Sequence, residues 1–401
     1  MRRWLTLLAV LLLAGCDATA EDRLAEQVGG LRGRLLVRTD GGYVRNGVGT
    51  TVRLKDGRLL HLVTRHRPRR GVSPDHWPAD IAAMTSADEG RSWTRPRPLF
   101  RGPGPSAVQP GLARLANGEL GVAYSRIDGP ASARAVFRRS ADEGRTWSEE
   151  IPLSPTGGYW TSAHDRLLRL SSGRLVIPLH MKLVVRPERM ATRVAWSDDN
   201  GRSWRLSPQV LTVEAMIPAY RARPVVAAQA GPGFWEASIA ERADGSLLML
   251  GRTYAGSLHA ATSADGGVSW TEPVPTSLVT GASPGRLERL PGSEGRLLVV
   301  WNRCCLDPAS ALLGRRLTLS AAVSSDGGAT WEVVRDLEAI APRGRVDYPA
   351  ILVSDGWVLV AYKVGGRPLA PHGSQEYLAV LPLAGFTADG PVGAAKIAPA
   401  R

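Results

Sequence analysis

Ser86-Ala-Asp88-Glu-Gly90-Arg-Ser92-Trp93 is the stretch that decides the fold of this chain, because the same pattern recurs along the sequence. The pattern reads Ser-x-Asp-x-Gly-x-Ser/Thr-Trp, and its further copies span residues 140–147, 197–204, 263–270 and 324–331. In such a motif, aspartate accepts hydrogen bonds from turn amides, glycine adopts a positive φ, and tryptophan packs a hairpin onto its neighbour. We call these copies the boxes. We expect each to be a structural turn and assign none of their aspartates to catalysis.

A second periodic signal lies between the boxes. A polar residue followed by glycine and then by apolar residues indicates a hairpin turn. Such pairs occur at Asp56-Gly57, Asn117-Gly118, Ser172-Gly173, Asp244-Gly245, Glu294-Gly295 and Asp355-Gly356. Repeats of this length, with about four short strands each, have the size of propeller blades. We therefore expect an all-β, six-bladed β-propeller whose last blade is closed by a strand at residues 35–39, which would hide the sheet edges.

Composition limits the classes of function. The chain has 401 residues, of which 44% are hydrophobic, so it has enough apolar material for a large core. Its formal charge of +13 comes almost entirely from arginine. Because these arginines are scattered rather than clustered among aromatic residues, we expect no nucleic acid partner. A positive surplus is also what an enzyme for acidic substrates would carry.

The N-terminus indicates export. Arg2 and Arg3 precede an apolar run at residues 5–13, which is too short to span a membrane. The ending Leu13-Ala-Gly-Cys16 is similar to the bacterial lipobox, in which the cysteine is lipidated. We expect a lipoprotein signal peptide at 1–16, a polar tether at 17–33 and the propeller at 34–401. The protein would then be membrane-anchored, in the periplasm or at the outer membrane or cell surface. An ordinary signal peptide or an uncleaved anchor is the alternative.

Cysteine usage predicts no metal site. After Cys16, the chain holds only the neighbours Cys304 and Cys305, and a disulfide between neighbours is strained. No metal-ligand spacing is present, so we expect neither a metal nor an organic cofactor.

Matched positions in the repeats locate the chemistry. About nine residues before each hairpin glycine, every repeat has a polar residue where its innermost strand would begin. These are Arg45-Asn46, Gln109, His164-Asp165, Glu236, Ser283 and Tyr348. Such a ring predicts a solvated pocket. The alternative is a structural channel filled with small residues and water.

Over residues 40–381 the chain resembles the sialidase (neuraminidase) superfamily, whose Asp-boxes, or BNR repeats, have the pattern of the boxes. Glu236 followed sixteen residues later by Arg252 looks like the family's glutamate-to-arginine segment. Arg315-Arg316 ahead of the fifth box looks like another arginine-bearing segment. Asp347-Tyr348-Pro349 resembles the final segment, which carries a tyrosine nucleophile.

The resemblance implies a set of roles. Tyr348 would be the nucleophile, Glu236 the base that activates it, and Asp75 the acid, with Asp80 in reserve. Arginines bind a sugar carboxylate through paired donors, whereas a carboxylate nucleophile would be repelled by the substrate. The residues expected to bind substrate are Arg45, Arg252, Arg316, His164 and Asp165.

Each role has a structural alternative. Tyr348 could be a packed strand-end residue, and Asp75 part of an ordinary Pro-Asp turn. The arginines could be solvated surface charges, and Asp165 could pair with Arg166.

The chain departs from the family at two places. It reads Val44-Arg45-Asn46-Gly47 where the family has Arg-Ile-Pro, and Lys363 where the family has a glutamate that steadies the first arginine.

We expect a monomeric, exo-acting glycoside hydrolase, exo-α-sialidase-like, that cleaves a terminal acidic sugar from a sialoglycoconjugate or related acidic glycan. Another nonulosonic acid or a uronate-linked residue is an open choice of sugar. The alternative function is a non-catalytic glycan-binding or scaffolding lipoprotein of the cell envelope.

Overall fold

The computed structural model describes residues 33–101, 106–185, 187–221, 231–304, 315–341, 343–366, 373–387 and 395–397. The predicted signal peptide, and all of the predicted tether except Gly33, lie outside the described residues. The described helices are single turns: η1 (Pro74–His76), α2 (Pro218–Arg221) and α4 (Ala384–Thr387). In these ranges no helix has the length and apolar character needed to cross a bilayer.

The rest of the described structure is built from β-strands in five hydrogen-bonded sheets, four of which have four or five strands. The second sheet holds β7 (Ala107–Arg114), β8 (Leu120–Gly129), β9 (Ser132–Ser140) and β10 (Ile151–Pro152). The third holds β11 (Trp160–Thr161), β12 (Leu168–Arg169), β13 (Leu175–Val184), β14 (Arg189–Ser197) and β15 (Arg205–Leu206). The fourth holds β16 (Trp235–Glu241), β17 (Leu247–Arg252), β18 (Ser257–Ser263) and β19 (Val274–Val279). The fifth holds β20 (Arg286–Arg289), β21 (Leu297–Asn302), β22 (Thr318–Ser324), β23 (Trp331–Ala339) and β27 (Ala395–Ile397).

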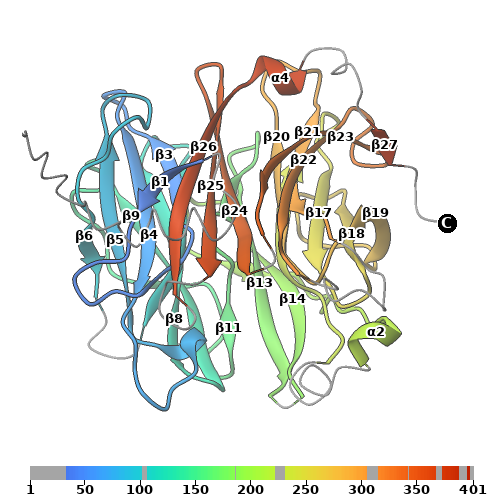
Figure 1. The fold of residues 1–401 in the computed structure, drawn as a ribbon, viewed down its shortest axis with the longest axis horizontal. Coiled ribbons are helices and arrows are strands. Elements are labelled where there is room, and N and C mark those ends of the chain that lie inside the picture. The colour runs from blue at the N-terminus through green and yellow to red at the C-terminus, as the bar shows by residue number, and fades with distance from the viewer. Residues whose placement is uncertain are drawn as a thin grey trace, which may run out of the picture.

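The first sheet has nine strands and joins the two ends of the described chain. Its strands are β1 (Arg34–Val37), β2 (Arg45–Asn46), β3 (Thr50–Arg53), β4 (Leu59–His66), β5 (Ala79–Ser86), β6 (Arg97–Phe100), β24 (Gly344–Ser354), β25 (Trp357–Gly366) and β26 (Ser374–Pro382). β2 links the early and late strands through one parallel pair, Arg45 with Ser374. β1 pairs antiparallel with β26, beside which it lies in Figure 1. The expected N-terminal strand therefore does pair with the C-terminal strands, at 34–37 rather than 35–39.

The sheets have a propeller-like arrangement, in which each sheet contacts the next. β3 lies against β7, β7 against β12, β13 against β16, β16 against β20, β20 against β24, and β24 against β3. Apolar clusters fill the spaces between neighbouring sheets: for example, Leu62 and Ile81 pack with Leu112 and Val122. Burial of these side chains is the main favourable term that holds the sheets together. The ring of contacts therefore closes on itself.

The boxes are structural turns, as expected. In the first, the Asp88 carboxylate accepts from the Ser92 amide at 2.8 Å and from the Ser92 hydroxyl at 2.6 Å. Gly90 has φ +76°, and Trp93 Nε1 donates to the Gly90 carbonyl at 3.1 Å. The aspartate contacts and the positive φ of the glycine recur in the other four boxes. The tryptophan-to-carbonyl bond recurs in the second, third and fourth boxes, whereas Trp331 Nε1 of the fifth has no such partner within the described ranges. The glycines of the six predicted hairpin turns also have positive φ, which confirms those turns.

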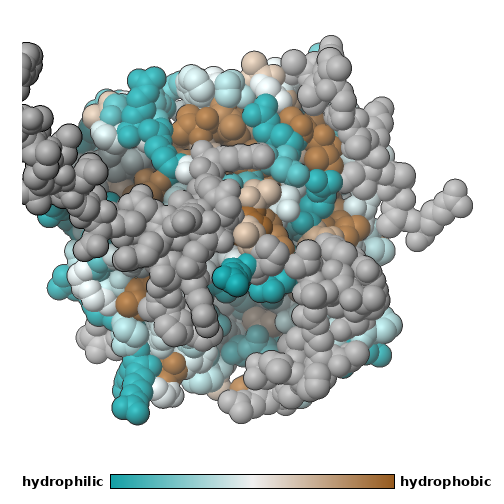
Figure 2. Space-filling model, in the orientation of Figure 1, coloured by the Kyte–Doolittle hydropathy of each residue, from teal (hydrophilic) through white to brown (hydrophobic). Residues whose placement is uncertain are grey.

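The surface mixes polar and apolar side chains. Large exposed apolar residues occur on separate elements, including Leu183 and Val184 on β13, Val274 on β19 and Trp357 on β25. On the face shown in Figure 2, hydrophobic patches of the described residues are interspersed with hydrophilic ones. Scattered apolar residues of this kind are normal on a protein surface.

Candidate active site

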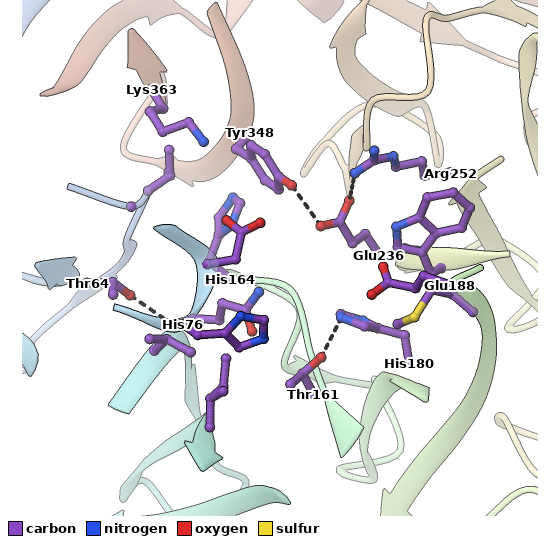
Figure 3. A pocket seen from close by; sticks show the side chains of 18 of the residues that line it. Thr64, His76, Thr161, His164, His180, Glu188, Glu236, Arg252, Tyr348 and Lys363 are labelled. Atoms are coloured by element: carbon purple, nitrogen blue, oxygen red, sulfur yellow. Dashed lines mark hydrogen bonds and ion pairs between the residues drawn. The ribbon is translucent and has the colours of Figure 1, made fainter. Parts of the chain in front are cut away.

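The inner ends of the sheets surround a cavity of about 580 Å³. Its lining runs through almost the whole chain, from Arg45 on β2 to Lys363 on β25. Most of the side chains expected to form a site line this cavity: Arg45, Asp75, His164, Glu236, Arg252, Arg316 and Tyr348. Four of these are labelled in Figure 3. The fold therefore gathers at one place residues that are far apart in the sequence.

Tyr348, Glu236 and Arg252 form a hydrogen-bonded chain in the cavity (Figure 3). The Tyr348 hydroxyl donates to Glu236 Oε1 at 2.8 Å, and Arg252 Nη1 donates to Glu236 Oε2 at 2.7 Å. The guanidinium of Arg252 also lies 4.7 Å above the centroid of the Trp235 ring. Tyr348 is on β24 and Glu236 on β16, so two different sheets supply the pair. A carboxylate in this position is within reach of the phenol proton.

Unusual backbone conformations aim these side chains. Gln109, Glu236 and Tyr348 have φ of +60°, +50° and +58°, a left-handed conformation that residues with a Cβ adopt at a cost. In each case the pairing register of the inner strand shifts at that point, as in a β-bulge. A bulge re-aims one side chain without ending the strand. Strain of this kind concentrates at functional sites.

The protonation states of Tyr348 and Glu236 are set by burial and by neighbouring charged groups. Desolvation raises the pKa of Tyr348 to about 12, and the nearby Glu236 carboxylate adds to the effect. Desolvation also opposes the charge of Glu236, but the ion pair with Arg252 outweighs it and lowers the pKa of Glu236 to about 2. At neutral pH, Tyr348 is therefore a neutral phenol that donates to an ionised Glu236.

A second charge cluster lies beside Tyr348. The buried carboxylate of Asp347 contacts Arg316 Nη1 at 2.7 Å, Lys363 Nζ at 3.1 Å and Arg345 Nε at 3.4 Å. Although desolvation opposes its ionisation, these three cations lower the pKa of Asp347. Arg316 is thus held at the cavity by an ion pair, and it lies 5.4 Å from the centroid of the Tyr348 ring.

Arg45 and Asp75 form a third pair, with Arg45 Nη2 at 2.8 Å from Asp75 Oδ1. Desolvation opposes the Asp75 charge, but the charge of Arg45 prevails and lowers the pKa of Asp75 to about 2. Asp75 is on η1 and most of its side chain is exposed, whereas Arg45 is largely buried. In the free protein, therefore, Asp75 is ionised. Asp80, the reserve acid, does not line the cavity and instead accepts from the Tyr43 hydroxyl at 2.6 Å.

Histidines supply part of the polar wall. His164 lies with its ring centroid 5.6 Å from that of Tyr348, and desolvation lowers its pKa to about 3. His66 and His180, which the sequence reasoning missed, also line the cavity, and desolvation lowers their pKa to about 3 and about 4. His180 contacts the Thr161 hydroxyl at 2.5 Å. Neutral imidazoles of this kind suit hydrogen bonding to sugar hydroxyls. His66 and His180 lie on β4 and β13, which no inner-strand pattern marks.

Asp165 is not brought into the cavity. Its carboxylate accepts from Thr50 Oγ1 at 2.8 Å, Arg286 Nε at 2.7 Å and the Ile351 amide at 3.0 Å. These partners use the carboxylate fully, so the expectation that Asp165 contacts substrate has no support in the geometry. Its partner is also Arg286, not Arg166.

The cavity is strongly cationic. Its lining includes the cations Arg45, Lys182, Arg252, Arg315, Arg316, Arg345 and Lys363, against the carboxylates Asp75, Glu188 and Glu236. Among the described residues, Arg45 Nε, Gln109 Oε1 and Arg252 Nε are buried in this lining without a hydrogen-bond partner. The unpaired arginine donors favour an anionic ligand, and the unpaired amide oxygen favours a ligand that also carries donors such as hydroxyls. The described part of the chain has no cluster of three or more side chains that could hold a metal ion.

Comparison with solved structures identifies the fold. A sialidase from the Hadza microbiome, Hz136, aligns with a TM-score of 0.68 at 17% identity, over 88% of this chain and 69% of that one. The NanB sialidase of Streptococcus pneumoniae aligns with a TM-score of 0.66 at 12% identity, over 89% and 71%. A protein of unknown function from Dyadobacter fermentans aligns with a TM-score of 0.63 at 18% identity, over 88% and 100%.

Sequence comparison identifies the family. No curated protein matches the chain significantly. Residues 110–360 match the BNR repeat-like domain, a span of more than half the chain. The chain therefore belongs to the family of BNR repeat-like domains, and its fold is the one that sialidases have.

Proposed function

We propose that this protein is an exo-acting glycoside hydrolase, sialidase-like, that removes a terminal acidic sugar through Tyr348. The observation that carries the proposal is the 2.8 Å hydrogen bond from the Tyr348 hydroxyl to Glu236, inside a cavity lined by arginines. A glycan-binding protein has no need of a strained tyrosine next to a base. A tyrosine nucleophile needs both the phenol and a neighbouring base that takes the phenol proton.

The substrate class follows from the charge of the site. Arg45, Arg252 and Arg316 all line the cavity, and planar guanidinium groups bind carboxylates through paired donors. The surplus of cations over carboxylates would attract an anionic sugar and orient it. A carboxylate on the anomeric carbon would repel an aspartate or glutamate nucleophile, whereas a neutral tyrosine can approach it. Sialic acid is the first choice, and related nonulosonic acids or uronates belong to the same class.

The first chemical step is a displacement at the anomeric carbon. The Tyr348 oxygen forms a bond to that carbon as the bond to the leaving oxygen breaks, and Glu236 takes the phenol proton. Asp75 gives a proton to the leaving oxygen. In the second step, water attacks the same carbon, Asp75 takes a proton from it, and Tyr348 leaves and regains its proton from Glu236.

Substrate binding would also change the proton affinities of Asp75 and Glu236 to those that the reaction needs. In the free protein, Arg45 and Arg252 hold Asp75 and Glu236 in their ionised forms. A substrate carboxylate would compete for both arginines. As these ion pairs weaken, the pKa of each carboxyl would rise, so Asp75 could hold a proton and Glu236 would become a stronger base.

We include six blades in this proposal. The nine-stranded sheet divides at the single parallel pair between Arg45 and Ser374 into two antiparallel units. Together with the four smaller sheets this makes six. A cluster that includes Leu59, Leu359 and Leu378 packs the first unit against the last.

Location and anchoring are proposed from the sequence. Export and lipidation at Cys16 would place the enzyme on a membrane, where it meets glycoconjugates, as a monomer that binds no nucleic acid. Incorporation of labelled fatty acid in the native host should be lost on Cys16→Ser. Incorporation that persists in this variant would contradict the proposal.

The test of the function is turnover of aryl glycosides. The purified protein should release the aryl group from an aryl sialoside or another member of a panel of acidic aryl glycosides, and Tyr348→Phe should abolish release. Tyr159→Phe is the matched control, because Tyr159 lines the same cavity but its ring centroid lies 3.9 Å from Lys182 Nζ. Sugar binding without turnover across the panel would instead favour the glycan-binding alternative.

A further inference from the structure

Lys363 is a buried cation that points at the candidate nucleophile. Its side chain on β25 is 5% exposed and its Nζ lies 4.2 Å from the centroid of the Tyr348 ring. In Figure 3, Lys363 and Glu236 lie on opposite sides of Tyr348, with Glu236 at the hydroxyl and Lys363 toward the other end of the ring. The mechanism proposed above uses Glu236 but gives Lys363 no task.

The cluster around Lys363 remains positive. Its counter-ion Asp347 is shared with Arg316 and Arg345, so one carboxylate faces three cations. Asp347 therefore cancels only part of the positive charge near the ring. A buried cation with an incomplete counter-charge acts strongly on its neighbours, because the interior screens charge poorly.

Proton transfer from Tyr348 to Glu236 moves negative charge onto the phenol ring. An ammonium near the face of a neutral ring is already attracted to it, and it attracts a phenolate more strongly. Burial and the Glu236 carboxylate raise the pKa of the phenol, whereas the charges of Arg252 and Arg316 act to lower it. A further cation close to the ring would favour the phenolate in the same way as these arginines.

We infer that Lys363 is a positioning residue for Tyr348, held near the ring by Asp347 so that its ammonium stabilises the phenolate that forms when Glu236 takes the proton. This inference rests on the proposed function for its catalytic meaning. The electrostatic effect on the Tyr348 phenol itself does not depend on that function. The two can therefore be tested separately.

Several other charged and titratable groups face Lys363. They are Asp347, Arg345, Arg316, Arg45, Asp75, His66 and His164. The pKa of Asp75 is about 2 and that of each histidine is about 3. Desolvation, only partly offset by Asp347, lowers the pKa of Lys363 to about 7. The Lys363 ammonium is therefore present below about pH 7, so its effect on the phenol must be measured there.

The experiment titrates the phenol at position 348 directly. A polyfluorinated tyrosine, which is acidic enough to ionise while the Lys363 ammonium is still protonated, is incorporated at position 348 of the full chain, and its ionisation is followed by fluorine NMR. Lys363→Met should lower the acid dissociation constant of this phenol about tenfold, whereas Lys363→Arg should largely preserve it. Lys182→Met is the matched control, because Lys182 also lies over a cavity tyrosine, Tyr159, and pairs with Glu188 at 2.8 Å. It should leave the phenol at position 348 unchanged.

Two outcomes would overturn the inference: an unchanged dissociation constant in Lys363→Met, or an equal change in Lys182→Met. If Lys363→Met does not fold, Lys363→Gln takes its place. A phenol that responds as expected in a chain that turns over no glycoside would retain the inference and reject the proposed function.

Discussion

At the scale of single residues, the site combines strain with buried charge. Glu236 and Tyr348 both have left-handed backbones, which cost roughly 1–2 kcal/mol each for a residue with a Cβ. Glu236 is buried and Tyr348 is partly buried. The Glu236 carboxylate pairs with Arg252, and the charge cluster at Asp347 lies beside Tyr348. Apolar packing alone would favour neither the left-handed backbones nor the buried charges. Together these two features are typical of residues with a functional role.

Glu236→Gln tests the base. Glutamine keeps the shape of the side chain and can still accept from Tyr348, but it cannot take the proton. We expect kcat on an aryl glycoside to fall about 10²- to 10⁴-fold. Glu188→Gln is the matched control, since Glu188 lines the same cavity and pairs with Lys182. Comparable losses of kcat in the two variants would show that Glu236 is not specifically the base.

The same residue predicts a dependence of stability on pH. The folded pKa of Glu236, about 2, lies below its unfolded value, so its contribution is complete above about pH 4.5 and is lost as the pH falls toward 2. That contribution is roughly 2–3 kcal/mol. Melting temperatures measured from pH 7 to pH 3 should therefore fall less steeply for Glu236→Gln than for the unchanged chain. Parallel curves would contradict the ion-pair account.

At the scale of elements, the boxes fasten the hairpins. Asp326 in the fifth box accepts from the Thr330 amide at 2.9 Å, the Thr330 hydroxyl at 2.5 Å and the Ser324 hydroxyl at 2.7 Å. Asp326→Ala should cost about 1–2 kcal/mol of unfolding free energy, and Asp326→Asn, which keeps one acceptor oxygen, about half as much. Urea unfolding measures both. Because no residue of this box lines the cavity, kcat below the melting temperature should not change. A loss of kcat would mean that the box shapes the site.

The elements also show where sequence reasoning succeeds and where it stops. The turns and strands follow from local patterns, because glycine conformation and alternating apolar residues are local properties. The bulge does not. Counting outward from the pair Ser354–Trp357 without a bulge sets Tyr348 opposite Lys363, whereas the register shift sets Asp347 there instead. The ion pair of Asp347 with Lys363 was therefore invisible to a count of residues.

Long-range contacts were equally hidden. The resemblance to sialidases picked out Glu236, Arg252, Arg316 and Tyr348, and all of them line the cavity. Matched positions in the repeats also singled out Asp165, because such positions do not say which way a side chain points. His180 and Lys182 reach the cavity from β13, outside the inner-strand positions that the repeats mark.

At the scale of the whole molecule, Asp165 acts as a tie between sheets. Its carboxylate accepts from Thr50 on β3, Arg286 on β20 and Ile351 on β24, each more than a hundred residues away in the sequence. All of these groups are buried. A buried charge with such partners links the stability of separate sheets.

A double-mutant cycle measures this tie. Asp165→Asn removes the charge that Arg286 and the Ile351 amide require, and Arg286→Met leaves Asp165 as a buried anion without its cation, so each should cost about 3–5 kcal/mol in urea unfolding. The double variant should be more stable than the sum of the two losses predicts, by about 1–3 kcal/mol, because it leaves neither of these two charges without the other. If the two losses simply add, Asp165 and Arg286 act independently. The central ion pair would then be a local contact, and apolar packing between neighbours would be what makes the ring of sheets unfold as one unit.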